Sequence, residues 1–370
     1  MEDRLSLMKG SSKIYDIVYR TDFSDLKNEI SSLVDASSKI CIVTDSNVKP
    51  LYSKEVEDQL KDSFELVYTY SFEAGENSKN TRTVEGVLRS LVEHEFTRND
   101  ILIALGGGVV GDLTGFTASC YMRGISFIQI PTTLLSMVDS SIGGKTGVDL
   151  DGYKNMVGSF YNPILVYMNV NVLTTLDERQ YFAGFAEAMK SALIKDAKLY
   201  TDMVSNSYEI CEKDPDIVAD MIYRCNLIKK AVVEKDPHEK TGERALLNLG
   251  HTIGHAIEKE KGFSLLHGEC VALGCVAAAF ISHKKGFLSV EECYEIRDMF
   301  VPFSLPISVY DIDVDKVCES VQHDKKRKGK TVNFVLLKKI GKAFVSAEVT
   351  KEEIRDAILE IYYSEEDMKE

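Results

Sequence analysis

Three histidines gather in the segment Arg244–Glu269, and their spacing suits a metal site. His251 and His255 are four residues apart, so on a helix their side chains project from the same face. His267 follows Lys261–Gly262, which predicts a turn back toward that face. Converging neutral imidazoles are typical ligands of transition metals, zinc above all. The alternative is two ordinary helix histidines and one loop histidine.

Glycines and one carboxylate strengthen the metal hypothesis. Gly250, Gly254 and Gly268 stand among the histidines, and because glycine within a helix costs about 1 kcal/mol relative to alanine, it usually indicates close approach of another group. Glu187 and Lys190 lie three apart in an apolar stretch, GFAEAMKSALIKD. A surface ion pair is the common explanation of that spacing, but the carboxylate could also complete a histidine–carboxylate metal site.

Length and composition favour a two-domain globular protein. The chain has 370 residues, 44% of them hydrophobic, and a net charge of −14 that argues against nucleic acid as the main partner. No apolar run reaches the length of a membrane span, and the first residues lack the apolar core of a signal peptide. Eight cysteines without CxxC spacing predict free thiols, mostly buried. We therefore expect a cytoplasmic protein that does not enter membranes.

The first half alternates strand and helix patterns, which predicts a parallel sheet covered by helices on both faces. Ligands of such sheets bind beyond the carboxyl ends of the strands. The expected strands are Lys13–Tyr19, Ser38–Thr44, Phe64–Tyr70 and Asp100–Leu105, and the expected helices are Asp25–Val34, Leu51–Leu60 and Thr83–His94.

The second half is predicted to be mostly helical, with a domain boundary near Leu176, so the expected domains are residues 1–176 and 177–370. A hairpin is expected at Thr331–Val345. The expected helices are Arg179–Lys195, Asp196–Val204, Asp216–Val233, Arg244–Glu260, Gly268–Lys284, Val290–Phe300 and Glu352–Tyr363.

Two polar, glycine-rich segments of the first half suit anion binding. Ala104–Phe116, ALGGGVVGDLTGF, follows a strand and opens a helix, so its backbone N–H groups could approach phosphates. The segment lacks the GxGxxG fingerprint, and a purely structural turn is the alternative. Ile130–Asp149 is rich in serine, threonine, glycine and lysine between apolar strands. Asp45, at the end of an earlier strand, could bind a ribose hydroxyl or merely cap a turn.

These segments together resemble the 3-dehydroquinate synthase family of the sugar phosphate cyclase superfamily. The resemblance runs from about Lys13 to the last helix. It rests on the ordered motifs GENSK, GGGVVGDLTGF, YMRG, IPTTLLSMVDSSIGGKTGVD, KN, GFAEAMK, RALLNLGHTIGHAIE, HGE and DKK. The family implies an α/β fold: an N-terminal Rossmann-like NAD domain with a parallel sheet, followed by a mostly helical metal-binding domain.

The resemblance also implies roles for individual residues. Zinc, or cobalt, would be bound by Glu187, His251 and His267. NAD would be contacted by Asp45, Glu76, Lys79, Gly107, Gly108, Asp112, Thr132, Thr133, Lys145, Lys154 and Thr175. Substrate would be contacted by Asp139, Lys145, Lys154, Asn155, Lys190, Lys229, Arg244, Asn248 and His255. Either Lys325 or Lys326 would reach a phosphate, and Arg123 would come from the partner subunit of a homodimer.

The implied reaction converts 3-deoxy-D-arabino-heptulosonate 7-phosphate to 3-dehydroquinate and phosphate. It proceeds by transient oxidation with NAD, phosphate elimination, re-reduction, ring opening and aldol closure, as a step of the shikimate pathway. Another sugar phosphate cyclase is one alternative, but its substrate lacks the carboxylate that Lys229, Arg244 and Asn248 would serve. A metal-dependent polyol dehydrogenase and a non-catalytic NAD-binding module are the others.

Overall fold

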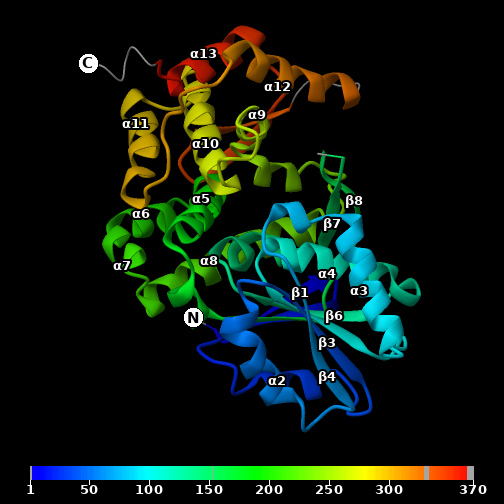
Figure 1. The fold of residues 1–370 in the computed structure, drawn as a ribbon. Coiled ribbons are helices and arrows are strands. Elements are labelled where there is room, and N and C mark those ends of the chain that lie inside the picture. Colours follow the sequence, from blue (N-terminus) through cyan, green and yellow to red (C-terminus); the bar gives the residue numbers. More distant parts are fainter. Residues whose placement is uncertain (1, 152, 329–332, 365–370) are drawn as a thin grey trace. The chain divides into compact units, whose positions relative to one another are not determined.

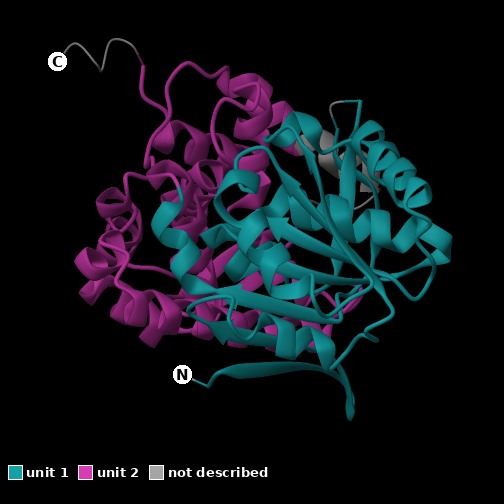
Figure 2. Cartoon of the chain, turned by 60° about the horizontal axis from the view of Figure 1, so that its bottom comes forward, with its two compact units in different colours: residues 1–176 teal, residues 177–370 magenta. Residues whose placement is uncertain are grey.

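The computed structural model describes residues 2–151, 153–328 and 333–364, and the side chains of all of these except 322–328. The chain divides into two compact units, Met1–Leu176 and Asp177–Glu370 (Figure 2). The division falls where the alternating strand and helix pattern of the sequence gives way to a helical one.

The first unit is built on a seven-stranded sheet in the order β1-β2-β9-β6-β5-β3-β4 (Figure 1). All neighbouring strands are parallel except β1 and β2, which form an antiparallel pair at one edge. The strands are β1 Arg4–Lys9, β2 Ser12–Arg20, β3 Lys39–Asp45, β4 Leu66–Phe72, β5 Ile101–Gly106, β6 Ser126–Pro131 and β9 Leu165–Asn169, and a separate hairpin comprises β7 Lys145–Leu150 and β8 Tyr153–Phe160.

The central strands are buried on both faces, as expected where helices cover a parallel sheet. Every residue of β5 and of β9 is buried. The helices are α1 Leu26–Ser31, α2 Lys54–Leu60, α3 Thr81–Glu93 and α4 Gly108–Cys120, with short π segments Lys49–Ser53 and Ser136–Ser140 and short 3-10 helices Glu76–Ser78, Tyr121–Arg123 and Val170–Thr175. Because β3, β4, β5 and β6 run parallel, the loops after them meet at one edge of the sheet.

The second unit is helical and is organised around α10, His267–Lys284, which packs against α5, α9, α11 and α13. Its residues are buried almost throughout, the pattern expected of a central helix. The other elements are α5 Glu178–Lys195, α6 Ala197–Ser205, α7 Ser207–Cys211, α8 Pro215–Lys235, α9 His251–Glu260, α11 Val290–Asp298, α12 Val314–Lys328, α13 Lys351–Ile361, the hairpin β10 Phe334–Lys339 with β11 Lys342–Ser346, and the 3-10 helices Arg244–Asn248 and Val301–Phe303.

The structure corrects three expectations. The single helix expected over Arg244–Glu260 is wrong: a 3-10 helix ends at Asn248, and α9 begins at His251 after Gly250, whose φ of 78° no regular helix tolerates. Helix α1 is shorter than expected and ends at Ser31. Strand β1 is an addition, because no element was expected before Lys13. The hairpin is confirmed from Phe334 onward, while Thr331 lies outside the described residues.

Two further observations bear on the predictions from composition. All eight cysteines are free, and most of them are buried. None of the described helices combines the length and the apolar character that a membrane crossing requires.

Candidate active site

Three helices of the second unit bring Glu187, His251 and His267 together. Glu187 lies in the middle of α5, His251 begins α9, and His267 begins α10. His267 Nε2 lies 3.3 Å and His251 Nε2 3.6 Å from the same oxygen, Glu187 Oε1. The turn expected at Lys261–Gly262 is present between α9 and α10, with Gly262 at φ 58°. A carboxylate and two imidazoles that converge from separate helices are the donor set of a metal site.

The Glu187 carboxylate is buried, so its negative charge needs a cation nearby. It is 1% exposed, and in the described part of the chain neither of its oxygens accepts a hydrogen bond of normal geometry. It forms a buried ion pair with Lys190, so the surface ion pair considered above is excluded. Burial disfavours its charge, but Lys190 and the two histidines hold the pKa of Glu187 well below its usual value. Glu187 is therefore an ionised carboxylate in a dry site, which suits a divalent metal.

The two histidines differ in protonation. Burial and the nearby Lys190 charge lower the pKa of His251 to about 3, and its Nδ1 lies 3.0 Å from the Leu249 carbonyl oxygen. That contact leaves Nε2 as the free lone pair, the form that binds metal. Burial also opposes the charge on His267, but the neighbouring carboxylates of Glu187 and Glu258 outweigh burial and raise the pKa of His267 to about 9. Without a metal His267 carries a proton that zinc would displace.

His255 offers a second way to complete the cluster. One ligand atom from each of His251, His255 and His267 lies within 4.8 Å of the others, while His255 is exposed and its two partners are partly buried. The ring centroids of His255 and His267 are 5.7 Å apart. The geometry thus accommodates both donor sets considered above, the three histidines or Glu187 with His251 and His267. Either set fits zinc or cobalt.

The glycines around the histidines serve helix packing. A Cβ at Gly250 would lie 2.7 Å from the Val271 carbonyl oxygen, and one at Gly254 would lie 2.6 Å from the Cys270 carbonyl oxygen. Both acceptors belong to α10, so these glycines let α9 and α10 approach closely. The glycines in the sequence indicate the close approach of another group, and that group is helix α10. The contact between α9 and α10 in turn fixes the separation of His251 and His267.

The expected substrate cations of the second unit are buried near α5. Lys190, Lys229 and Arg244 are 1%, 5% and 2% exposed. Lys229 is carried by α8, and both α8 and the 3-10 helix that starts at Arg244 pack against α5. Buried cations are costly unless they are paired; Lys190 pairs with Glu187, and Arg244 Nε lies 3.8 Å from Glu239 Oε1. Asn248, at the end of that 3-10 helix, is exposed. The side chains of Lys325 and Lys326 lie outside the described residues.

The glycine-rich loop of the first unit joins a buried strand to the N-terminus of a helix. Strand β5 ends at Gly106 and α4 starts at Gly108, so Gly107 is the helix N-cap. A Cβ at Gly107 would lie 2.9 Å from Thr133 Cγ2, which explains the need for glycine there. Thr132 follows β6, donates its backbone N–H to Gly106 O at 3.0 Å, and has a buried hydroxyl oxygen without a hydrogen-bond partner among the described residues. Gly107 and Thr133 therefore lie against each other at the N-terminus of α4, where backbone N–H groups can bind anions.

Lys79 is the centre of a second polar cluster of the first unit. Its ammonium donates to Asp112 Oδ2 and to Asn155 Oδ1, both at 2.7 Å, and it is 5% exposed. Burial opposes its charge, but Asp112 and Glu76 outweigh burial and raise the pKa of Lys79. Lys154 Nζ lies 3.6 Å from Glu76 Oε1. Five residues expected from three separate motifs, Glu76, Lys79, Asp112, Lys154 and Asn155, therefore lie in one cluster.

The remaining expected residues of the first unit lie on its loops and edges. Asp45 Oδ1 accepts from the backbone N–H groups of Asn47 and Val48, both at 2.9 Å, so the turn-cap role is present. Thr175 Oγ1 donates to Val172 O at 3.1 Å. Asp139 lies in the π segment Ser136–Ser140, and Lys145 is exposed at the start of β7. Arg123 is exposed.

Two acidic residues of these clusters were missed by the sequence reasoning. Glu258 is 3% exposed, and its Oε1 lies 3.7 Å from His267 Nδ1. It follows His255 by three residues in the quoted HTIGHAIE motif, so helical spacing could have indicated it. Asp149 accepts from Asn155 N at 2.7 Å and donates its own N–H to Lys79 O at 2.8 Å. It is the last residue of the polar segment Ile130–Asp149.

The chain combines an α/β unit with a helical unit that holds a carboxylate–histidine cluster. Solved structures of sugar phosphate cyclases share this fold. A 2-epi-5-epi-valiolone synthase from Streptomyces hygroscopicus, with NAD⁺ and Zn²⁺ bound, is 27% identical, with a TM-score of 0.88 over 96% of this chain and 98% of that chain. A 2-deoxy-scyllo-inosose synthase complexed with carbaglucose-6-phosphate, NAD⁺ and Co²⁺ is 25% identical, with a TM-score of 0.83 over 96% and 99%. A probable glycerol dehydrogenase from Sinorhizobium meliloti shares the fold, with 16% identity and a TM-score of 0.64.

Sequence comparison narrows this class. Residues 69–183 match the 3-dehydroquinate synthase N-terminal profile, and residues 184–327 match the 3-dehydroquinate synthase C-terminal profile. A 3-dehydroquinate synthase of Ruminiclostridium cellulolyticum is 41% identical over 94% of this chain and 96% of its own length. Another, from Acetivibrio thermocellus, is 42% identical over 88% and 90%. The chain belongs to the 3-dehydroquinate synthase family.

Proposed function

We propose that this protein converts 3-deoxy-D-arabino-heptulosonate 7-phosphate to 3-dehydroquinate and phosphate, with NAD and zinc or cobalt as cofactors. The observation that carries the proposal is the buried Glu187 carboxylate between Lys190 and two histidines, with Lys229 and Arg244 close by on elements that pack against α5. A metal site with several lysine and arginine side chains nearby suits a sugar acid phosphate, which carries both a carboxylate and a phosphate. Relatives that are 41% identical over at least 90% of this chain are named 3-dehydroquinate synthase.

When bound, NAD would supply a transient hydride acceptor and the metal a Lewis acid for substrate hydroxyls. The residues of this chain would hold both and orient the substrate. Glu187, His251 and His267 would bind the metal. The NAD-binding set would be Asp45, Glu76, Lys79, Gly107, Gly108, Asp112, Thr132, Thr133, Lys145, Lys154 and Thr175. The dense polar clusters around Gly107 and Lys79 support that assignment.

Substrate charge would be met by the cations and by His255. Lys190, Lys229 and Arg244 would neutralise carboxylate and phosphate and stabilise enolate charge, since preorganised cations in a dry site act strongly on developing charge. His255, exposed beside the metal cluster, would bind the phosphate. Asn248, Asp139, Lys145, Lys154 and Asn155 would contact the substrate's remaining polar groups.

We also infer a cytoplasmic homodimer in which Arg123 reaches the neighbouring subunit's site. Met122 and Arg123 have φ angles of 47° and 70°, a conformation that costs free energy in non-glycine residues. Such strain is retained where a side chain must be presented in one direction. The free cysteines support a reducing compartment.

One experiment tests the proposed reaction. The purified protein is incubated with the heptulosonate phosphate, NAD and zinc, while phosphate, NADH and ring product are followed together. We expect phosphate in many-fold excess over bound NAD, with no accumulation of NADH. Stoichiometric NADH would indicate a polyol dehydrogenase, and turnover only of a sugar phosphate without a carboxylate would indicate another cyclase.

A further inference from the structure

The loop between α8 and the 3-10 helix Arg244–Asn248 is closed around one carboxylate. Asp236 follows the last residue of α8 and is 1% exposed. Its Oδ1 accepts from Lys240 N at 2.7 Å, and its Oδ2 accepts from Gly242 N at 3.0 Å and from Arg244 N at 3.3 Å. Thr241 N lies 3.2 Å from both oxygens. Burial disfavours the charge, but these backbone donors outweigh it and lower the pKa of Asp236 to about 2.

Stability of the helix does not account for this carboxylate. Asp236 is the C-cap of α8, and the C-terminus of a helix carries a partial negative charge. An acidic side chain there is repelled by the helix dipole, whereas a lysine or an arginine would be attracted. Among the described residues, the hydrogen bonds that the Asp236 carboxylate accepts all come from the loop that follows. The position is therefore explained by the loop.

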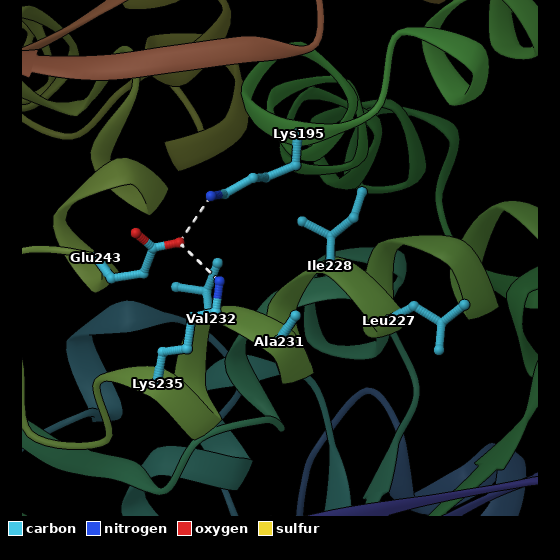
Figure 3. Close-up of a pocket in the computed structure, with 7 residues that line it drawn as sticks. All are labelled: Lys195, Leu227, Ile228, Ala231, Val232, Lys235 and Glu243. Carbon is cyan, nitrogen blue, oxygen red and sulfur yellow. Dashed lines mark hydrogen bonds and ion pairs between the residues drawn. The ribbon is translucent and has the colours of Figure 1, made fainter.

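The loop needs such a contact to keep its shape. Glu239 and Gly242 have φ angles of 54° and 89°, so two of its residues lie in the left-handed region. A non-glycine residue such as Glu239 adopts that conformation only when its surroundings enforce it. On the outer side, Glu243 pairs with Lys195 at 2.7 Å at the rim of a hollow over α8, as Figure 3 shows. Lys195 is the last residue of α5, the helix that carries Glu187 and Lys190.

Arg244 is held by this loop through both its backbone and its side chain. Its N–H donates to Asp236 Oδ2, and its guanidinium Nη1 donates to the Pro237 carbonyl oxygen at 2.9 Å. The guanidinium is almost completely buried, and its Nε lies 3.8 Å from Glu239 Oε1. Opening the loop would therefore move two things at once: the start of the 3-10 helix at Arg244 and the Pro237 carbonyl that orients the guanidinium.

We propose that Asp236 is a positioning residue that closes the loop 236–244 and thereby fixes Arg244 for substrate binding. The inference rests on the proposed role of Arg244 at the substrate. It assigns to Asp236 no contact with substrate, metal or NAD.

A double-mutant cycle in the full-length holoenzyme tests the proposal. Asp236→Ala, Arg244→Ala and the double variant are compared for KM, kcat and zinc content. We expect Asp236→Ala to raise the KM for the heptulosonate phosphate about 10- to 100-fold, as small displacements of a substrate-binding group do, with zinc retained. The double variant should be no worse than Arg244→Ala, because both changes remove the same interaction. Amide hydrogen exchange should show lost protection at residues 240–244.

A matched control separates positioning from folding. Asp214 caps the opposite end of α8, where its Oδ1 accepts from Asp216 N and Ile217 N, both at 3.1 Å. Asp214→Ala should lower the melting temperature without changing KM. If Asp236→Ala does not fold, Asp236→Asn is measured in its place. The asparagine keeps one acceptor oxygen, but its NH₂ group faces some of the backbone N–H groups that now donate to the carboxylate.

Each outcome decides one question. Additive effects of Asp236→Ala and Arg244→Ala, or a fall in kcat with unchanged KM, would overturn the positioning role while leaving the proposed function intact. Near wild-type kinetics of Arg244→Ala would instead overturn the role of Arg244 in the proposed function and, with it, the inference about Asp236. Unchanged exchange at residues 240–244 in Asp236→Ala would show that the carboxylate does not close the loop.

Discussion

Gly268 packs against Ala183 so closely that a Cβ at Gly268 would lie 1.8 Å from the Ala183 carbonyl oxygen. Gly268 is the second residue of α10, and Ala183 lies one turn before Glu187 in α5. The two metal-ligand candidates His267 and Glu187 therefore owe their separation to a contact between backbones. No side-chain rearrangement can relieve a clash with a backbone atom, so this contact is rigid.

Gly268→Ala should accordingly damage both stability and the metal site. Overpacking a well-packed contact costs about 1–3 kcal/mol, and here the strain moves the first turn of α10 with His267. We expect a lower melting temperature and substoichiometric zinc, measured by thermal unfolding and elemental analysis. Gly286→Ala is the control, because Gly286 has a φ of 75° but open space around it. That variant should lose stability through backbone strain and keep its zinc; equal zinc content in both variants would contradict the prediction.

The histidine variants decide between the two donor sets. We expect His251→Ala and His267→Ala to lose zinc and activity. His255→Ala should retain stoichiometric zinc yet turn over poorly, because three protein ligands with an open position are the usual layout of catalytic zinc. Elemental analysis of the purified variants is the measurement. Zinc lost from His255→Ala but kept in Glu187→Gln would favour the three-histidine set, whereas zinc kept in His267→Ala would contradict both sets.

Zinc binding should depend on pH through His267. Its pKa is raised to about 9 in the metal-free protein, so at pH 7 zinc displaces a proton from it, whereas His251, with a pKa of about 3, has none to lose. The apparent zinc affinity should therefore rise about tenfold per pH unit between pH 7 and 9 and then level off. Titration calorimetry in two buffers of different ionisation enthalpy should detect about one proton released from His267 at pH 7. A pH-independent affinity over this range would contradict the assignment.

Variants of Lys79 can separate its contribution to stability from its proposed contribution to NAD binding. Lys79→Met leaves the Asp112 carboxylate without its ion pair, which costs about 3–5 kcal/mol for a buried pair. Lys79→Met with Asp112→Leu should regain much of that stability but not NAD affinity, measured by denaturant unfolding and NAD titration. Lys54→Met is the control, because the Lys54–Asp58 pair is exposed and such pairs contribute about 1 kcal/mol at most. Full NAD affinity in the double variant would remove Lys79 and Asp112 from the proposed cofactor site.

Lys229 tests the preference for a carboxylated substrate. Leaving one charge of a desolvated pair without its partner costs about 2–5 kcal/mol, so Lys229→Met should lower kcat/KM severely for the heptulosonate phosphate. Steady-state kinetics measure the effect, and Lys230→Met on the same helix is the control, since Lys230 pairs with Glu234 at 3.4 Å. Near wild-type turnover of Lys229→Met would favour a different cyclase substrate.

Much of the fold follows from local patterns in the sequence, and what escapes them depends on tertiary contacts. The strand β5 and the helix that opens after Gly107 are predictable because apolar runs and glycines report directly on burial and turns. The break before α9 is less accessible, because only the close packing of Gly250 on α10 shows why the backbone must turn there. Strand β1 could not be predicted, since its alternating pattern becomes meaningful only beside β2.

In the candidate site, too, some features follow from local spacing in the sequence and others depend on tertiary contacts. Spacing alone brings His251 and His255 to one face, whereas the position of Glu187 beside His251 depends on how α5 packs, which no spacing reveals. The buried Lys190–Glu187 pair illustrates the limit well. In the sequence it is indistinguishable from a surface pair, and only the 1% and 2% exposure of the two side chains separates them.

The strand order carries a consequence for synthesis of the chain on the ribosome. Strand β2 can pair with β1 as soon as both have been synthesised, because they are adjacent in the sequence. Its other neighbour is β9, so the inner edge of β2 stays uncovered until residues 165–169 have been synthesised and pair with residues 16–20. An uncovered strand edge can pair with other chains. Nascent chains shorter than about residue 169 therefore expose an aggregation-prone edge, and β1 limits that exposure to one side.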